Sequence, residues 1–392
     1  MNSVNKNLPK LLQCYRRQCA SETPQPCWLR GNVPLEEGVN LHGVFLAETG
    51  LGESARLFHR ALSTQVVKLS ACNRKLKDRQ NETSFRDLVS NDAPYNVSIN
   101  IDGLTSFKGL HHQICKRKHN VAYPFWELDS IPEKYVNYLK KYDSLWAPSS
   151  FILETLKRYG FTEAELVKHP VDLPVEKQQF VDPTRALRIL FYFDFDSFPA
   201  RKNPEAAVFA FQQAFQNRED VTLTIKARGK RDVGRRHWLA QQVAGDPRIT
   251  IIDRLLDRKA VNALMAEHDV FLSLHRSEGL GLGCAEALAA GKAVVATDYG
   301  GSTEFITTKT GFPVEWTRVR VDPEAYVLAE NATWAEPSID HAAKLLRSIY
   351  ENPVVAKERA KAGFQHLVEN HSFDAVGCKI VSLLRKKGFV AA

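Results

Sequence analysis

Long apolar runs are missing from this chain of 392 residues. None approaches the roughly 18 consecutive apolar residues of a membrane-spanning helix. Residues 1–22 also lack the long apolar segment of a secretory signal peptide. We therefore expect a cytoplasmic protein that touches a membrane, if at all, as a peripheral protein at its inner face.

Metal-binding and nucleic-acid-binding patterns are also missing. Seven cysteines, an odd number spread along the chain, favour reduced thiols. Cys14, Cys19 and Cys27 lie close together, but no further Cys or His completes a zinc pattern. No interleaved aromatic signature of RNA binding accompanies the basic residues, so a nucleic-acid partner is not expected.

What the chain has in excess is positive charge, a formal +8, much of it at residues 116–118 and 228–236. Such a charge favours anionic partners, among them phosphates and an acidic membrane surface. A solvated basic face is an equally good interpretation of these clusters.

Strand and helix patterns alternate along the rest of the chain, which predicts an α/β fold with parallel sheets covered on both faces. A polar, proline-bearing stretch divides the alternation into two halves. We expect a basic extension at residues 1–38, a first domain at 39–172 joined by a final helix at 372–392, a linker at 173–184, and a second domain at 185–371. Residues 72–95 are polar and charged, which predicts a loop or a mobile lid.

One stretch, residues 273–301, carries the chemistry. An apolar strand is followed by a glycine-rich turn, a helix of small apolar residues and a second buried strand. Glycines let a phosphate approach the backbone, and the start of a helix attracts anions. Glu278 and Glu286 flank this turn and suit hydroxyl groups better than phosphates. A diphosphate with sugar hydroxyls on both sides, as in a nucleotide sugar, would use all of these features.

Glu278 and Glu286 match the E-x7-E motif, and the stretch resembles retaining GT-B glycosyltransferases of family GT4. The resemblance is specific over residues 186–315 and looser over 41–172. It implies two Rossmann-like domains that face each other across a cleft, with the last helix crossing back to the first domain. It also implies that Glu278 approaches the donor sugar, that Glu286 holds the ribose, and that the turn between them faces the sugar and diphosphate. The turn comprises Gly279, Leu280, Gly281, Leu282 and Gly283.

Further donor-site residues follow from the same resemblance. Lys202 matches a phosphate-binding lysine, but Asp196 stands where many members carry an arginine. Arg201, Lys226 or Arg228 would have to substitute, and Lys226, at the end of its strand, is the best candidate. The loop at Leu255 would lie beside the nucleobase, and His275 would either reach the donor or cap its strand.

In the first domain the resemblance points to a glycine loop and to a carboxylate among aromatics. Gly50 and Gly52 correspond to the loop near the diphosphate and acceptor, although a tight turn would also need glycine. Glu127 would contact an acceptor hydroxyl, unless Trp126 and its neighbours only pack in the core. His169 begins a His-Pro-Val-Asp segment for which an interdomain structural role and substrate contact are both open.

Asp194 and Asp196 form a DxD triplet, which binds a divalent cation in other glycosyltransferases. Because lysines and helix starts can already neutralise a diphosphate here, we expect no metal or other cofactor.

The sequence thus predicts a hexose transfer from a GDP- or UDP-sugar, such as GDP-mannose, to a glycan or lipid-linked saccharide in bacterial envelope polysaccharide or lipopolysaccharide synthesis. An epimerase or phosphorylase of the same fold, or a non-catalytic glycan-binding relative, remains as an alternative. A pyridoxal-dependent phosphorylase would need its own lysine motif, which is not seen.

Overall fold

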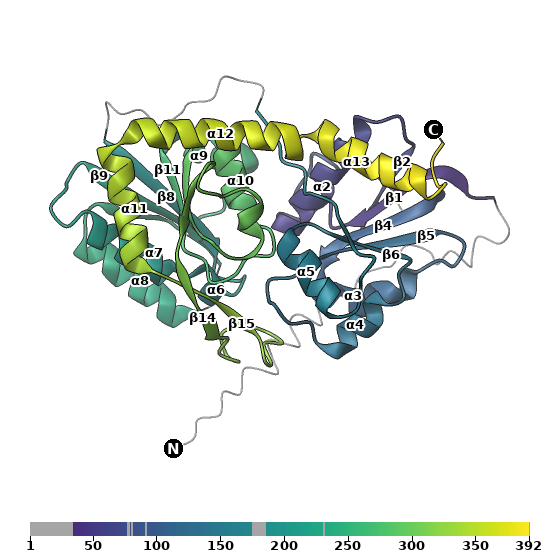
Figure 1. The fold of residues 1–392 in the computed structure, drawn as a ribbon, viewed down its shortest axis with the longest axis horizontal. Helices are drawn as coiled ribbons and strands as arrows, with labels where there is room; N and C mark the ends of the chain where they lie inside the picture. The colour runs from purple at the N-terminus through teal and green to yellow at the C-terminus, as the bar shows by residue number, and fades with distance from the viewer. Residues whose placement is uncertain are drawn as a thin grey trace, which may run out of the picture. The chain divides into compact units, whose positions relative to one another are not determined.

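The computed structural model describes residues 34–76, 79, 81–90, 92–174, 186–229 and 232–391. The chain divides into two compact units, which we call the first and second domain (Figure 1). The first comprises the described residues up to Pro170 and from Asn370 onward, and the second runs from Val171 to Glu369. Most of the predicted extension and linker lies outside the described residues.

The first domain is built on a seven-stranded parallel sheet in the order β3-β2-β1-β4-β5-β6-β7. Its central strands are buried along most of their length, which is why they read as continuous apolar runs. The strands are β1 (Glu36–Gly43), β2 (Leu69–Asn73), β3 (Val89–Ser90), β4 (Tyr95–Gly103), β5 (His119–Phe125), β6 (Ser144–Ala147) and β7 (Glu165–Leu166).

Helices cover this sheet, and the last helix of the chain is one of them. The helices are α2 (Gly50–Ser63), α3 (Phe107–Leu110), α4 (Glu133–Leu139), α5 (Ser150–Arg158) and α13 (Phe373–Lys386). α13 buries Val376, Ile380 and Leu384 in the first domain's core. The predicted return of the last helix to the first domain is therefore confirmed, whereas the facing of the two domains across a cleft stays a prediction.

The second domain has a six-stranded parallel sheet in the order β10-β9-β8-β11-β12-β13. Its strands are β8 (Leu187–Asp194), β9 (Val221–Arg228), β10 (Ile249–Ile252), β11 (Val270–Ser273), β12 (Ala293–Thr297) and β13 (Phe312–Val314). The helices are α6 (Pro199–Lys202), α7 (Pro204–Ala214), α8 (Val233–Gly245), α9 (Arg258–Glu267), α10 (Leu282–Ala289), α11 (Ile339–Glu351) and α12 (Pro353–His371).

Several elements were not anticipated, among them the short helix α3. An antiparallel hairpin, β14 (Trp316–Arg320) with β15 (Thr333–Pro337), is attached to the second domain. Helix α8 follows β9, and the short strand β3 interrupts the stretch expected to be a loop. The hairpin and β3 are stabilised by strand pairing, which local sequence pattern does not record.

The cysteines only partly meet the expectation of reduced thiols. Cys72, Cys284 and Cys378 are thiols. Cys115, in contrast, is disulfide-bonded, so the expectation is wrong at this residue.

Candidate functional site

The strand order places a topological switch point at the carboxyl edge of the second sheet. β9 and β10 lie on one side of β8, while β11 to β13 lie on the other. The connections after β8 and β11 therefore leave toward opposite faces of the sheet. In open α/β sheets this switch point is where ligands bind. Here the two connections carry α6 and the Glu278 turn.

The structure brings three predicted residues, Glu278, Arg201 and Lys202, into direct contact. Arg201 Nη1 lies 2.9 Å from Glu278 Oε2, and Lys202 Nζ contacts Glu278 Oε1. Burial alone would raise the pKa of Glu278, but Arg201 and Lys202 outweigh it and lower that pKa to about 2. Glu278 is therefore a carboxylate at neutral pH, and the three side chains together carry one net positive charge.

Helix α6 presents both cations through an unusual backbone. Phe198 and Asn203, which flank it, have positive φ angles of 53° and 54°, a conformation that is uncommon for residues other than glycine. Arg201 is buried, and its Nη2 donates to Ser197 Oγ at 3.0 Å. Arg201, one of the candidate substitutes for the usual arginine, thus contacts Glu278, and its contact with a diphosphate stays a prediction.

The predicted glycine turn leads into α10 and packs tightly against the turn after β12. Gly281 caps α10 with φ of 78°, and no side chain caps the first amides of the helix. The Gly301 amide donates to Glu278 O at 2.7 Å. A Cβ on Gly301 would lie 2.1 Å from Gly279 O, so glycine is required for this approach. The turn that contains Gly301 therefore supports the glycine turn, whose last two residues, Leu282 and Gly283, are the first residues of α10.

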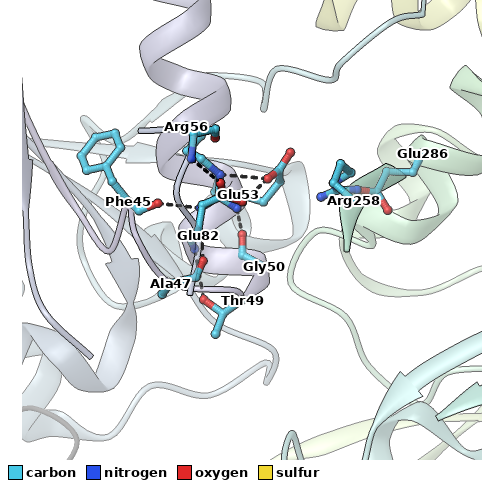
Figure 2. Close-up of polar contacts among 12 residues, drawn as sticks. Phe45, Ala47, Thr49, Gly50, Glu53, Arg56, Glu82, Arg258 and Glu286 are labelled. Atoms are coloured by element: carbon cyan, nitrogen blue, oxygen red, sulfur yellow. Dashed lines mark hydrogen bonds and ion pairs between the residues drawn. The ribbon is translucent and has the colours of Figure 1, made fainter. Parts of the chain in front are cut away.

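Glu286 is held by two side chains that the sequence analysis did not single out. Tyr192 Oη donates to Glu286 Oε2 at 2.6 Å. Arg258 Nη1 donates to Glu286 Oε1 at 2.7 Å, and Figure 2 shows these two side chains together. Burial and the Glu286 carboxylate raise the pKa of Tyr192 well above its usual value, so its hydroxyl stays a donor at neutral pH. Arg258 is partly exposed at the first position of α9.

Lys226 and Leu255 lie nearer to Glu286 than to Glu278 in the layout of the sheet. Lys226 is the register partner of Tyr192 on the neighbouring strand, so both side chains leave the same face. Burial and Arg228 lower the pKa of Lys226. Leu255, in the connection between β10 and α9, is 52% exposed.

His275 is fully buried and engaged on both ring nitrogens. Nδ1 lies 3.0 Å from Ser273 Oγ, and Nε2 lies 3.1 Å from Tyr299 O. Burial lowers its pKa, which favours the neutral ring. Of the two roles left open by the sequence, this geometry favours support of the strand end over contact with a donor.

The DxD triplet is used within the protein. Asp194 Oδ2 accepts from Arg228 Nε at 3.2 Å, and Asp194 Oδ1 accepts from the Asp196 amide at 2.8 Å. Among the described residues, no group of three or more His, Cys, Asp or Glu side chains could hold a metal ion.

The glycine loop of the first domain is tied down by hydrogen bonds. Thr49 Oγ1 accepts from the Gly52 amide at 3.1 Å, which begins α2. Ser54 Oγ donates to Gly50 O at 2.9 Å and lies 2.8 Å from His169 Nε2. His169 is buried, and burial lowers its pKa to about 3. Its neutral ring therefore supports this loop through its contact with Ser54.

Arg56 and Glu127 are the two other charged residues of interest in the first domain, and they differ in how firmly they are held. Arg56, buried in α2, donates to Phe45 O at 2.6 Å and Ala47 O at 3.1 Å and pairs with Glu53 (Figure 2). It fixes the backbone that precedes the glycine loop. Trp126 is buried and donates to Ser130 O, so it packs in the core, while Glu127 is half-buried just after β5.

The predicted site residues thus fall into two groups. Most lie on the second domain around the switch point, while Gly50, Gly52 and Glu127 belong to the first. The sequence missed Tyr192, Arg258 and two residues considered below, Arg276 and Glu336. For Tyr192 a signal was present, because a tyrosine in an otherwise phenylalanine-rich buried strand needs a partner for its hydroxyl.

The described residues contain no helix with the length and hydropathy required to cross a bilayer.

Comparison with known proteins points to one family. Residues 188–329 match the family model described as "Glycosyl transferases group 1". A GDP-mannose-dependent monoacylated alpha-(1-6)-phosphatidylinositol monomannoside mannosyltransferase from Corynebacterium glutamicum is 25% identical over 194 residues, which is 48% of this chain and 45% of the relative. The chain therefore spans about half the length of this curated relative.

Solved structures share the fold at low sequence identity. Sucrose-phosphate synthase from Thermosynechococcus elongatus gives a TM-score of 0.67 at 15% identity, covering 90% of this chain and 99% of its own. HepE from Anabaena, in complex with UDP and glucose, gives a TM-score of 0.62 at 12% identity, and the match covers 90% of this chain and 100% of HepE. TarM from S. aureus gives a TM-score of 0.57 at 15% identity, and the match covers 73% of this chain and 55% of TarM. Residues 188–329 are thus similar to the glycosyl transferases group 1 family, and the chain consists of two Rossmann-like domains with the GT-B fold.

Proposed function

We propose that this chain is a retaining glycosyltransferase that moves a hexose from a nucleotide diphosphate sugar to a hydroxyl of a glycan or lipid-linked saccharide. The observation that carries the proposal is the contact of Arg201 and Lys202 with Glu278 at the switch point. It combines cations for a diphosphate with an ionised carboxylate for sugar hydroxyls in one place.

Stabilisation of the leaving group is the main chemical task. As the bond between the sugar's anomeric carbon and the diphosphate oxygen breaks, negative charge grows on that oxygen. Arg201, Lys202 and the uncapped start of α10 would stabilise it. The acceptor oxygen forms the new bond on the same face of the sugar, and its proton passes to the departing phosphate.

Glu278 and Glu286 divide the recognition of the donor in this proposal. Glu278 would accept hydrogen bonds from the sugar. Glu286 would accept from the ribose, with Tyr192 holding its other oxygen in place. Arg258 would have to leave Glu286 or share it, which its partial exposure allows. Leu255 and Lys226 would border the nucleobase side, and Gly50, Gly52 and Glu127 would serve the acceptor.

No metal ion is included in the proposed reaction. The positive charge that a diphosphate requires is offered by Arg201, Lys202 and the helix start, and both oxygens of the Asp194 carboxylate already accept hydrogen bonds within the chain. Transfer without a divalent cation is therefore the simpler scheme.

The relatives suggest the range of substrates. The C. glutamicum relative is named for GDP-mannose and a phosphatidylinositol mannoside, and HepE was solved with UDP and glucose. We therefore propose a GDP- or UDP-hexose as donor, and a role in bacterial envelope polysaccharide or lipopolysaccharide synthesis. Peripheral contact with an anionic membrane would suit a lipid-linked acceptor and the chain's positive charge.

A thermal-shift screen of the full chain with UDP, GDP, UDP-glucose and GDP-mannose, with and without EDTA, tests the donor site. A ligand that binds only the folded state stabilises it by RT ln(1 + L/Kd), where L is the free ligand concentration, so Tm should rise with the logarithm of that concentration once it exceeds Kd. We expect one nucleotide series to raise Tm equally in both conditions. If no nucleotide diphosphate raised Tm, the proposal would fail, and loss of the effect in EDTA would overturn metal independence.

Product analysis with the selected donor and a saccharide acceptor separates transfer from the alternatives. A transferase gives free nucleoside diphosphate and a glycosylated acceptor, an epimerase gives an altered donor, and a phosphorylase requires inorganic phosphate. Glu278→Gln should reduce turnover at least 100-fold, while Asp246→Asn, on the opposite edge of the sheet, should not. Unchanged turnover in Glu278→Gln would contradict its assigned role.

A further inference from the structure

The β14–β15 hairpin contacts the donor site at Arg276, and Glu336 of the hairpin also accepts from Asn203 Nδ2 beside α6 at 3.5 Å. Arg276 lies two residues before Glu278 in the connection after β11. Its guanidinium forms a fork with Glu336 on β15, with Nε to Oε2 at 2.6 Å and Nη2 to Oε1 at 3.0 Å. The same guanidinium donates from Nη1 to Ala200 O in α6 at 2.8 Å. One arginine thus joins the hairpin, the Glu278 connection and the helix that carries the cations.

Backbone hydrogen bonds reinforce the same junction. The Arg276 amide donates to Arg201 O at 2.7 Å, and the Ala335 amide donates to Arg276 O at 2.9 Å. The Arg276 guanidinium also lies over the Trp334 ring at 5.8 Å. The hairpin therefore holds residue 276 from one side while residue 276 holds α6 from the other.

Helix α6 needs such support. It is a single turn bounded by Phe198 and Asn203, both with positive φ, and such backbone conformations persist only when surrounding structure holds them. A second contact from the hairpin's connecting loop supports the same segment, because the rings of Phe198 and Tyr326 lie 4.7 Å apart.

We propose that Arg276 and Glu336 are positioning residues for the donor site: the hairpin, acting through this pair, fixes α6 so that Arg201 and Lys202 meet Glu278. Glu336 lies beyond the residues that match the family model, which end at 329. Neither residue touches the proposed donor. The effect on turnover rests on the proposed function, but the structural effect does not.

Glu336→Gln is the direct test, since it keeps the side chain's size and removes its charge and one acceptor for Arg276. Asp246→Asn is the matched control, because Asp246 also forms a fork with an arginine, Arg248, at the amino end of β10. Hydrogen exchange followed by mass spectrometry on the unliganded chain gives the first readout. We expect faster exchange in residues 198–203 and 276–278 in Glu336→Gln, and not in Asp246→Asn.

Kinetics give the second readout. Loss of supporting partners typically costs 10- to 100-fold in activity, so Glu336→Gln should lower kcat/KM for the donor about 10-fold. Because Arg201 and Lys202 keep the Glu278 carboxylate ionised, a loosened α6 should also move the acid limb of the pH profile to higher pH. A merely structural loss would lower activity without moving that limb.

The outcomes separate this inference from the proposed function. Faster exchange at α6 in a chain that binds no nucleotide would support the positioning role while the proposed function failed. Unchanged exchange at residues 198–203 in Glu336→Gln would overturn the positioning role, whatever the activity. An unmoved acid limb in an otherwise active variant would also overturn it.

Discussion

Glu278 shows how a buried carboxylate can remain charged. Burial opposes ionisation, yet the pKa is lowered to about 2 because Arg201 and Lys202 both contact the carboxylate. A bound diphosphate would compete with Glu278 for the same two cations. In the unliganded chain, the pairing with Glu278 holds the Arg201 and Lys202 side chains in place and balances part of their positive charge.

Stability should depend on the charge of Glu278. Its pKa falls from 4.5 to about 2 on folding, so its contribution is complete above pH 4.5 and is lost as pH falls through about 2. A shift of this size corresponds to about 3 kcal/mol. Glu278→Gln should lower the free energy of unfolding of the second domain by about that amount at pH 7. Calorimetry at pH 7 and at pH 3 should show the difference from the parent chain shrinking at low pH.

A more exposed ion pair provides the control for this prediction. Glu205 pairs with Arg235 and is 29% exposed, so Glu205→Gln should cost less than about 1 kcal/mol. A Glu278→Gln defect of the same size at both pH values would show that the ionised carboxylate is not its source.

At the scale of elements, the site depends on two turns packed back to back. The turn from Glu278 to Gly281 rests on the turn that contains Gly300 and Gly301, and a Cβ on either of these two glycines would lie within 2.5 Å of backbone oxygen. The second turn is in turn joined to β11 through His275. Three segments thus determine where Glu278 and the start of α10 lie.

Gly301→Ala should displace the Glu278 turn. Its Cβ would lie 2.1 Å from Gly279 O, and forcing atoms into a packed site typically costs about 1–3 kcal/mol. We expect a lower Tm and at least a 10-fold weaker nucleotide affinity by isothermal titration calorimetry. Gly245→Ala, at the end of α8 where a Cβ meets nothing within 4 Å, should leave both unchanged or raise Tm slightly. Equal behaviour of the two variants would refute the close-packing argument.

At the scale of the whole molecule, the chain's last helix completes the first domain. α13 packs on α2, and Gly377 is the point of closest approach, since a Cβ there would lie 2.3 Å from Ala61 O. The first domain is therefore assembled from both ends of the chain, and its stability depends on residues remote in sequence from its sheet.

Gly377→Val should separate α13 from α2 and destabilise the first domain. We expect a drop of several degrees in the Tm of that domain, with little change in nucleotide affinity at the second. Lys379→Val, on the exposed side of the same helix, should have little effect on Tm. Should the two valines lower Tm equally, loss of helix propensity rather than packing would be the cause.

The sequence by itself determined the alternation of buried strands and helices, because such apolar runs are stable only inside a covered parallel sheet. Through their resemblance to a family motif, it also grouped Glu278, Lys202 and Arg201 in one candidate site. Short-range signals, such as a proline opening α7 or a glycine before α10, carried this information.

Only the tertiary structure decided which partners these groups have. Arg201 rather than Lys226 meets Glu278, Tyr192 and Arg258 hold Glu286, and Glu336 reaches the site through Arg276. The residues of each pair are 60 or more positions apart in the sequence, except for Arg258 and Glu286, which are 28 apart. Such contacts form when strand order and helix packing bring distant segments together, and no local periodicity encodes them.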